Sequence, residues 1–144
     1  MLESRNYEPL SILNARFGRD TVISLATMDG NRPAVRMVNS FYEEGAFYTV
    51  TYAHSNKMKQ IEINAAVAVC GEWFTAYGVG ENIGHPYDDK NVILMTKLRD
   101  AFQAWYDNGH INENDPHTCI LCVHLAQGVL YNDGKKYNIN FDED

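Results

Sequence analysis

Long apolar runs are absent from this chain of 144 residues. A helix that crosses a membrane needs roughly 18 or more consecutive apolar residues, and no stretch of the sequence approaches that length. The first residues, MLESRNYEPL, also lack the basic start and the apolar stretch of a secretory signal. We therefore expect a cytoplasmic protein that does not interact with membranes.

Basic residues are also few. Twelve Lys and Arg stand against 19 Asp and Glu, which gives a net charge of −7. Because nucleic-acid binding depends on a basic surface that neutralises phosphates, this balance argues against a general nucleic-acid binder. The charge is unevenly distributed, since residues 1–60 carry seven basic and six acidic residues and residues 61–144 carry five and thirteen. An anionic ligand is therefore expected to bind the first half of the chain.

Only three cysteines are present, Cys70, Cys119 and Cys122. They cannot all pair with one another, and in a cytoplasmic chain of this size we expect buried or idle thiols. His117, Cys119, Cys122 and His124 have the composition of a metal site, but side chains along a strand alternate between its two faces. Zinc needs four converging ligands. We therefore expect no metal site here, unless a dimer brings a second pair of ligands.

The residues that are abundant indicate a folded domain. Apolar residues make up 45% of the chain and aromatic residues 12%, a composition that a disordered protein does not have. No repeat, low-complexity tract or Pro/Gly/Ser-rich linker divides the sequence. We therefore expect a single domain over residues 1–144.

Turn residues and hydrophobic periodicity predict a mainly β protein with flanking helices. Asn132-Asp133-Gly134 is a type I′ hairpin signal. The stretch from Gly78 to Gly84 misses the spacing of a dinucleotide-binding loop and is better explained as a bulged strand. Without a β-α-β alternation, the order of elements favours a small antiparallel barrel with helices outside. We expect about seven strands, near 21–27, 34–42, 46–52, 66–74, 75–83, 118–131 and 136–141, and three helices, near 9–17, 56–64 and, the longest, 86–106.

The segment Ser55-Asn56-Lys57-Met58-Lys59 has an unusual charge pattern for a helix start. A helix N-terminus carries about half a positive charge and four unpaired N–H groups, so acidic residues are expected in its first turn. Here the first turn contains two lysines. A bound phosphate would explain them, because it would accept hydrogen bonds from the backbone and from the Ser55 hydroxyl. The alternative is that both lysines extend into solvent at little cost.

Arg36 favours the phosphate interpretation. It lies in the middle of a predicted strand, where a cation needs a partner, and its planar donor fork suits a phosphate. Thr51 lies on the next predicted strand, so Arg36, Thr51, Ser55 and Lys57 together form a candidate phosphate site. The alternative is an arginine at the barrel rim whose stem packs while its head reaches water.

These residues also carry a family resemblance. Arg36-Met-Val-Asn39, Phe47-Tyr-Thr-Val-Thr51, Ser55-Asn-Lys57 and Gln60-Ile-Glu-Ile-Asn64 occur in this order. The stretch from about residue 20 to 75 resembles the FMN-binding split-barrel family related to pyridoxamine 5′-phosphate oxidase. The resemblance implies a small antiparallel split β-barrel with FMN as its cofactor. Such proteins are usually homodimers, with FMN lying between the subunits.

The resemblance also implies roles for individual residues. Arg36 and Lys57 would hold the FMN phosphate, with hydroxyls from Thr51 and Ser55 nearby. The remaining cofactor-binding candidates are Met37, Val38 and Val50 at the isoalloxazine ring, the matched positions Asn39 and Asn56, and Trp73, which would reach the flavin of a partner subunit. Asn56 stands where relatives often carry a second basic residue, so one phosphate contact is either lost or supplied by Lys59.

The predicted function is that of a small FMN-dependent oxidoreductase whose small-molecule substrate and electron donor are open. Residues 135–144 lack the Arg-x-His element of the true oxidase, so pyridoxamine phosphate oxidation is not expected. No residue stands out as a catalytic acid or base. Two alternatives remain: a non-catalytic flavin or haem carrier or sensor, with His54, His85 or His124 near the haem, and a dimer that has lost its cofactor.

Overall fold

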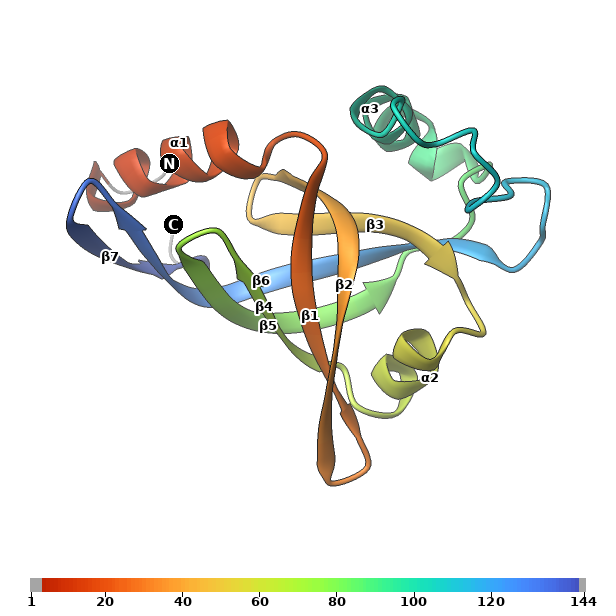
Figure 1. Ribbon diagram of the computed structural model, residues 1–144, viewed down its shortest axis with the longest axis horizontal. Coiled ribbons are helices and arrows are strands. Elements are labelled where there is room, and N and C mark those ends of the chain that lie inside the picture. The colour runs from red at the N-terminus through yellow and green to blue at the C-terminus, as the bar shows by residue number, and fades with distance from the viewer. Residues whose placement is uncertain (1–3, 143–144) are drawn as a thin grey trace.

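Seven antiparallel strands form one sheet in the computed structural model, which describes residues 4–142. Their order in the sheet is β3-β2-β1-β4-β5-β6-β7, and an additional pairing of β3 with β6 closes the first six strands into a barrel (Figure 1). β7 extends the sheet beyond β6. The mainly β barrel is therefore confirmed. The strands are β1 (Thr21–Asp29), β2 (Arg32–Glu43), β3 (Ala46–Tyr52), β4 (Ala66–Gly71), β5 (Phe74–Asn82), β6 (Thr118–Asn132) and β7 (Lys135–Asn140).

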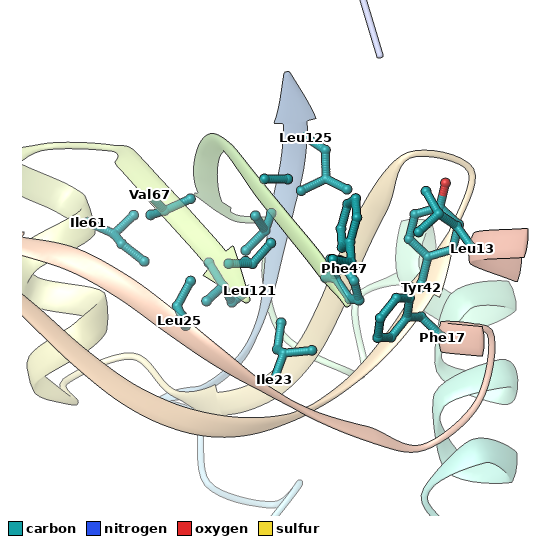
Figure 2. Close-up of a cluster of buried hydrophobic side chains, with 14 of the residues drawn as sticks. Leu13, Phe17, Ile23, Leu25, Tyr42, Phe47, Ile61, Val67, Leu121 and Leu125 are labelled. Atoms are coloured by element: carbon teal, nitrogen blue, oxygen red, sulfur yellow. The ribbon is translucent and has the colours of Figure 1, made fainter. Parts of the chain in front are cut away.

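Three α-helices flank the barrel: α1 (Ser4–Phe17), α2 (Asn56–Ile63) and α3 (Val92–Ala101), the last preceded by a short 3-10 turn (Asp89–Asn91). The barrel interior is filled by alternate apolar side chains of the strands, because successive side chains on a strand point to opposite faces. Figure 2 shows Leu13 and Phe17 of α1 at one end of this interior cluster and Ile61 of α2 at the other. None of the helices within residues 4–142 has the length and apolar content that crossing a bilayer requires.

A second apolar cluster lies outside the barrel, between α3 and the strands β3 and β6. Val50 of β3 and Ile120 of β6 point outward, and Met95 and Leu98 of α3 pack against them together with Phe102. This cluster fixes α3 and the turns that follow it beside the outer surface of β3.

The turn chemistry predicted for the hairpins is confirmed. Asp133 and Gly134 both have positive φ, 52° and 76°, as a type I′ turn requires. The pairing of β5 with β6 shifts register between Tyr77 and Gly78, which is the predicted bulge. A Cβ atom at Gly78 would lie 1.9 Å from the carbonyl oxygen of His124, so only glycine fits this position.

The boundaries of three predicted elements are wrong. The helix expected over 9–17 begins at Ser4, so Pro9 lies inside it and not at its start. The helix expected over 86–106 is α-helical only from Val92 to Ala101, and α1 is the longest helix. α3 does not begin before Val92 because the buried side chain of Asn91 donates to the carbonyl oxygens of Ile83 and His85. The strand expected over 66–74 ends at Gly71, and Trp73 lies in the following turn with a φ of 52°.

Candidate functional site

A cavity of about 770 Å³ lies where the barrel wall opens between β2 and β3. These two strands pair only where Phe41–Glu43 faces Ala46–Tyr48 and have no pairing with each other beyond that point within the described residues. Residues 37–39 of β2 and 49–52 of β3 therefore line the opening, with α2 at one end and residues 105–118 as the far wall. The volume lies within the roughly 300–1,000 Å³ typical of small-molecule sites.

Ser55 is at the α2 end of this cavity. It occupies the N-cap position, with φ −66° and ψ 158°, and its carbonyl oxygen accepts a hydrogen bond from the N–H of Lys59 at 3.0 Å. Its hydroxyl does not cap the helix, and Ser55 Oγ is buried with no hydrogen-bond partner among the described residues. An unsatisfied buried hydroxyl costs roughly 1–3 kcal/mol, so this atom marks a place where a hydrogen-bonding ligand group would be stabilised.

Lys57 is next to Ser55 in the cavity lining and is half-buried. No carboxylate within residues 4–142 forms an ion pair with it. Burial, and next the positive charge of Arg36, lower the pKa of Lys57 below its usual range. The site therefore holds a cation without a counterion beside an unsatisfied hydroxyl, and an anionic group would satisfy both.

Arg36 does not line the cavity, and much of its guanidinium is already engaged. Nη1 donates to Thr27 Oγ1 at 2.7 Å and to the carbonyl oxygen of Leu25 at 3.2 Å, and Nη2 donates to Gln60 Oε1 at 2.9 Å. These bonds tie α2 to β1 and β2 and so place Ser55 and Lys57. A guanidinium has five N–H donors, which leaves Nε and one Nη2 proton without a partner among the described residues.

Residues 105–118 are held over the cavity by several polar contacts, and two of these anchors are carboxylates. Arg99 of α3 makes a bidentate ion pair with Glu113, with both N···O distances at 3.0 Å, and the Tyr106 hydroxyl donates to the same carboxylate. Although burial raises the pKa of Glu113, the hydrogen bonds from Arg99 and Tyr106 hold it below its usual range. The second anchor is Asp20, whose Oδ2 accepts a hydrogen bond from Trp105 Nε1 at 2.9 Å.

The structure brings most of the predicted site residues together. Seven of them line the cavity: Met37, Val38, Asn39, Val50, Thr51, Ser55 and Lys57. Asn56 is exposed and outside the lining, and Trp73 is exposed in the turn between β4 and β5. Of the histidines, His110 lines the cavity whereas His54, His85 and His124 do not. No group of three or more His, Cys, Asp or Glu in residues 4–142 could hold a metal ion.

Sequence reasoning missed the far wall of the cavity. Trp105 falls within the helix expected over 86–106, and the polar segment 107–115 has no predicted role. That segment is rich in Asn, Asp and Gly, and a polar loop of this length between two well-formed elements is a common place for binding residues. This composition is the signal that could have found it.

Comparison with known proteins shows similarity in structure only. No family model matches the sequence, and no curated protein matches it. A protein related to general stress protein 26 of Bacillus subtilis, of the pyridoxinephosphate oxidase family, from Clostridium acetobutylicum is 15% identical, with a TM-score of 0.65 over 98% of both chains.

Two further similar structures are named for a cofactor. An FAD-binding protein from Mesorhizobium loti is 16% identical, with a TM-score of 0.64 over 88% of this chain and 92% of that one. A haem-binding protein from Mycobacterium smegmatis is 14% identical, with a TM-score of 0.69 over 99% of this chain and 60% of that one. The chain shares the fold of these three structures, and the split barrel that the sequence resemblance predicted is confirmed.

Proposed function

We propose that this protein binds FMN in the cavity between β2 and β3 and acts as a small flavin-dependent oxidoreductase. The observation that carries the proposal is the pair formed by the unsatisfied Ser55 hydroxyl and the uncompensated Lys57 ammonium. Both belong to one end of a cavity large enough for a cofactor. The substrate is a small molecule whose identity is open, and residues 1–144 are proposed to fold as one domain.

A phosphate group matches the chemistry of the Ser55 end. Phosphate oxygens accept hydrogen bonds from a hydroxyl and from the free N–H groups of a helix start, and they bring the negative charge that Lys57 lacks. Arg36 can add its free Nε donor and lies close enough for its charge to affect Lys57. The unusual lysines in the first turn of α2 are then explained as part of an anion site.

The rest of the cavity suits a planar heteroaromatic ring. The edges of β2 and β3 that face the opening offer backbone N–H and C=O groups, and Met37, Val50 and Trp105 offer apolar surface. When bound, a flavin supplies hydride or electron transfer at its ring, and the protein contributes binding, orientation and partial exclusion of water. Lys57, His110 and Asp115 are the residues of the lining that carry titratable cationic, imidazole and carboxylate groups.

The outer surface of the sheet supports a homodimer in which a second copy covers the cavity edge. Val35 and Met37 of β2 are 69% and 72% exposed, and they continue into an apolar groove of about 540 Å³ over β1, β4, β5, β6 and β7. We call this the outer groove; Ala26, Ala68 and Tyr77 lie in it. Contiguous exposed apolar surface of this kind marks protein–protein contacts. Met37 belongs to both the outer surface and the cavity lining, so a second copy seated there would also adjoin the FMN, and Trp73 is proposed to come from that copy.

Haem is the second candidate ligand, because His110 lines the cavity and imidazole is a common haem ligand. A non-catalytic carrier or sensor would use the same cavity. The visible spectrum of the purified protein distinguishes the two cofactors, since haem gives a Soret band and flavin does not.

Addition of FMN to the purified protein tests the proposal directly. We expect the flavin fluorescence to change on binding and the bound flavin to be reduced anaerobically by NADH, NADPH or a reduced deazaflavin. A protein that neither carries nor takes up FMN would contradict the proposed function. Bound flavin that none of these donors reduces would leave binding intact and contradict the oxidoreductase activity.

A further inference from the structure

Asp20 joins the two walls of the cavity. Its Oδ2 accepts a hydrogen bond from Trp105 Nε1 at 2.9 Å, and its Oδ1 accepts one from Asn39 Nδ2 at 3.1 Å. Asn39 lies on β2 and Trp105 on the segment after α3, and both line the cavity. One carboxylate, placed just before β1, therefore fixes one side chain on each side of the opening.

The held indole lies at the end of the cavity away from the phosphate site. Trp105 packs against the outer apolar cluster, which contains Val50 of β3. Ser55 follows Val50 by five residues in the sequence and lies beyond the end of β3. Tyr52 is the other aromatic residue of the lining, and its ring faces His54, with a centroid separation of 5.4 Å. Trp105 is thus the aromatic surface available to a ring system whose phosphate is bound at Ser55 and Lys57.

We propose that Trp105 and Asn39 form the ring-recognition wall of the cavity and that Asp20 is the positioning residue that orients both. This inference rests on the proposed flavin binding. A planar ring is recognised by an aromatic surface and an in-plane amide, and both contacts depend on the orientation of their side chains. A hydrogen bond to a carboxylate is among the stronger ones in proteins, so Asp20 restricts the indole more tightly than packing alone.

The hydrogen-bond pattern suggests a swap that separates orientation from general stability. In Asp20→Asn the side chain has one acceptor oxygen for two donors, so either Trp105 or Asn39 loses its partner. In the double variant Asp20→Asn/Asn39→Asp, the new amide oxygen accepts from Trp105 Nε1 and the new amide NH₂ donates to the new carboxylate. The double variant therefore restores both bonds with the same atoms in reversed roles. Asp100→Asn, an exposed acid on α3, is the matched control for loss of one negative charge.

The experiment uses the full chain with Trp73→Phe as background, which leaves Trp105 as its only tryptophan. The dissociation constants for FMN and for riboflavin are measured by flavin fluorescence, and near-UV circular dichroism reports the environment of Trp105. We expect Asp20→Asn to weaken the binding of FMN and the binding of riboflavin by the same factor, about tenfold. The variant should also reduce the near-UV circular dichroism of Trp105. The double variant should recover the Trp105 dichroism, because its indole regains a hydrogen-bond acceptor at residue 20, and Asp100→Asn should change neither signal.

The inference is overturned if the background protein binds FMN and the Asp20→Asn variant binds both FMN and riboflavin as tightly as the background protein does. It is also overturned if the double variant keeps the reduced Trp105 dichroism of the single one while retaining the melting temperature of the background protein. If Asp20→Asn fails to fold, Trp105→Phe, which keeps a ring and loses the N–H donor, provides the same comparison of the two flavins. A wild-type protein that binds neither flavin would instead contradict the proposed function itself.

Discussion

The two hollows of this protein differ in what their walls leave unsatisfied. None of the described residues that line the outer groove is charged, and small side chains such as Ala26 and Ala68 give it a smooth apolar floor. Among the described residues, no carboxylate forms an ion pair with Lys57 in the cavity between β2 and β3, and none of these residues is a hydrogen-bond partner of Ser55 Oγ there. Apolar surface is stabilised by any complementary protein surface, whereas an uncompensated cation and a buried hydroxyl need a ligand of opposite chemistry. From this comparison we propose that the outer groove contacts a second copy and that the cavity binds an anionic cofactor.

Removing the charge of Lys57 should have the largest effect, because it removes the property that distinguishes the cavity from the outer groove. We expect Lys57→Met to weaken FMN binding roughly 10- to 100-fold, because a hydrogen bond to a charged group contributes about 1.5–3 kcal/mol. Isothermal titration with FMN measures the effect. Lys59→Met is the matched control, since Lys59 is exposed on the same helix and outside the cavity lining. Equal losses in the two variants would contradict a specific role for Lys57.

Placing a charge on the outer surface tests the other half of the comparison. Val35→Asp should weaken self-association by at least about tenfold, because burying an unpaired carboxylate in an apolar contact is costly. Sedimentation velocity measures the shift from dimer to monomer. Ile63→Asp is the control, since Ile63 is 87% exposed on α2 and lies outside the outer groove. A monomeric wild-type protein, or a Val35→Asp variant that stays dimeric, would contradict the proposed assignment of this surface.

The smallest expected effect is on the stability of the protein without flavin. The pKa of Lys57 is lowered in the folded protein, so its charged form is disfavoured there. Between this pKa and the ordinary lysine value the unfolded chain binds more protons, so the wild-type stability rises with pH. Lys57→Met should therefore raise the melting temperature at pH 7, because the variant no longer buries an ammonium group. The difference should shrink as the pH rises through the folded pKa of Lys57.

A lower melting temperature for flavin-free Lys57→Met at neutral pH would show that the ammonium stabilises the fold. In that case Lys57 would be a structural residue, and its retention in the cavity would need no ligand. The stability measurement thus sharpens the meaning of the affinity loss, because a binding residue can reduce stability while a structural one cannot.

The parts of the fold that sequence predicts here depend on local chemistry. Asp133-Gly134 forms its type I′ turn because both residues tolerate positive φ. The helix start at Ser55 also follows from a short stretch of chain. In each case the deciding interactions lie within a few residues, so the pattern of residue types was sufficient.

The parts that the sequence did not predict depend on partners far away in the chain. Trp105 is held by Asp20, 85 residues earlier, and no periodicity reports such a bond. The start of α3 is set by the side chain of Asn91, which donates to carbonyl oxygens of the preceding loop. Arg36 was expected to face a phosphate, and most of its donors instead hold Gln60, Thr27 and Leu25. These ties are tertiary, and they decide which residues form the far wall of the cavity.

The most direct test of the central claim compares FMN with riboflavin, which differ by the phosphate alone. The ratio of their dissociation constants isolates the phosphate contribution from the ring contribution. We expect wild-type protein to prefer FMN strongly, Ser55→Ala to reduce the preference roughly 2- to 10-fold, and Lys57→Met to remove most of it. Equal affinity of the wild-type protein for both flavins, or a preference for FMN that survives in both variants, would contradict the account.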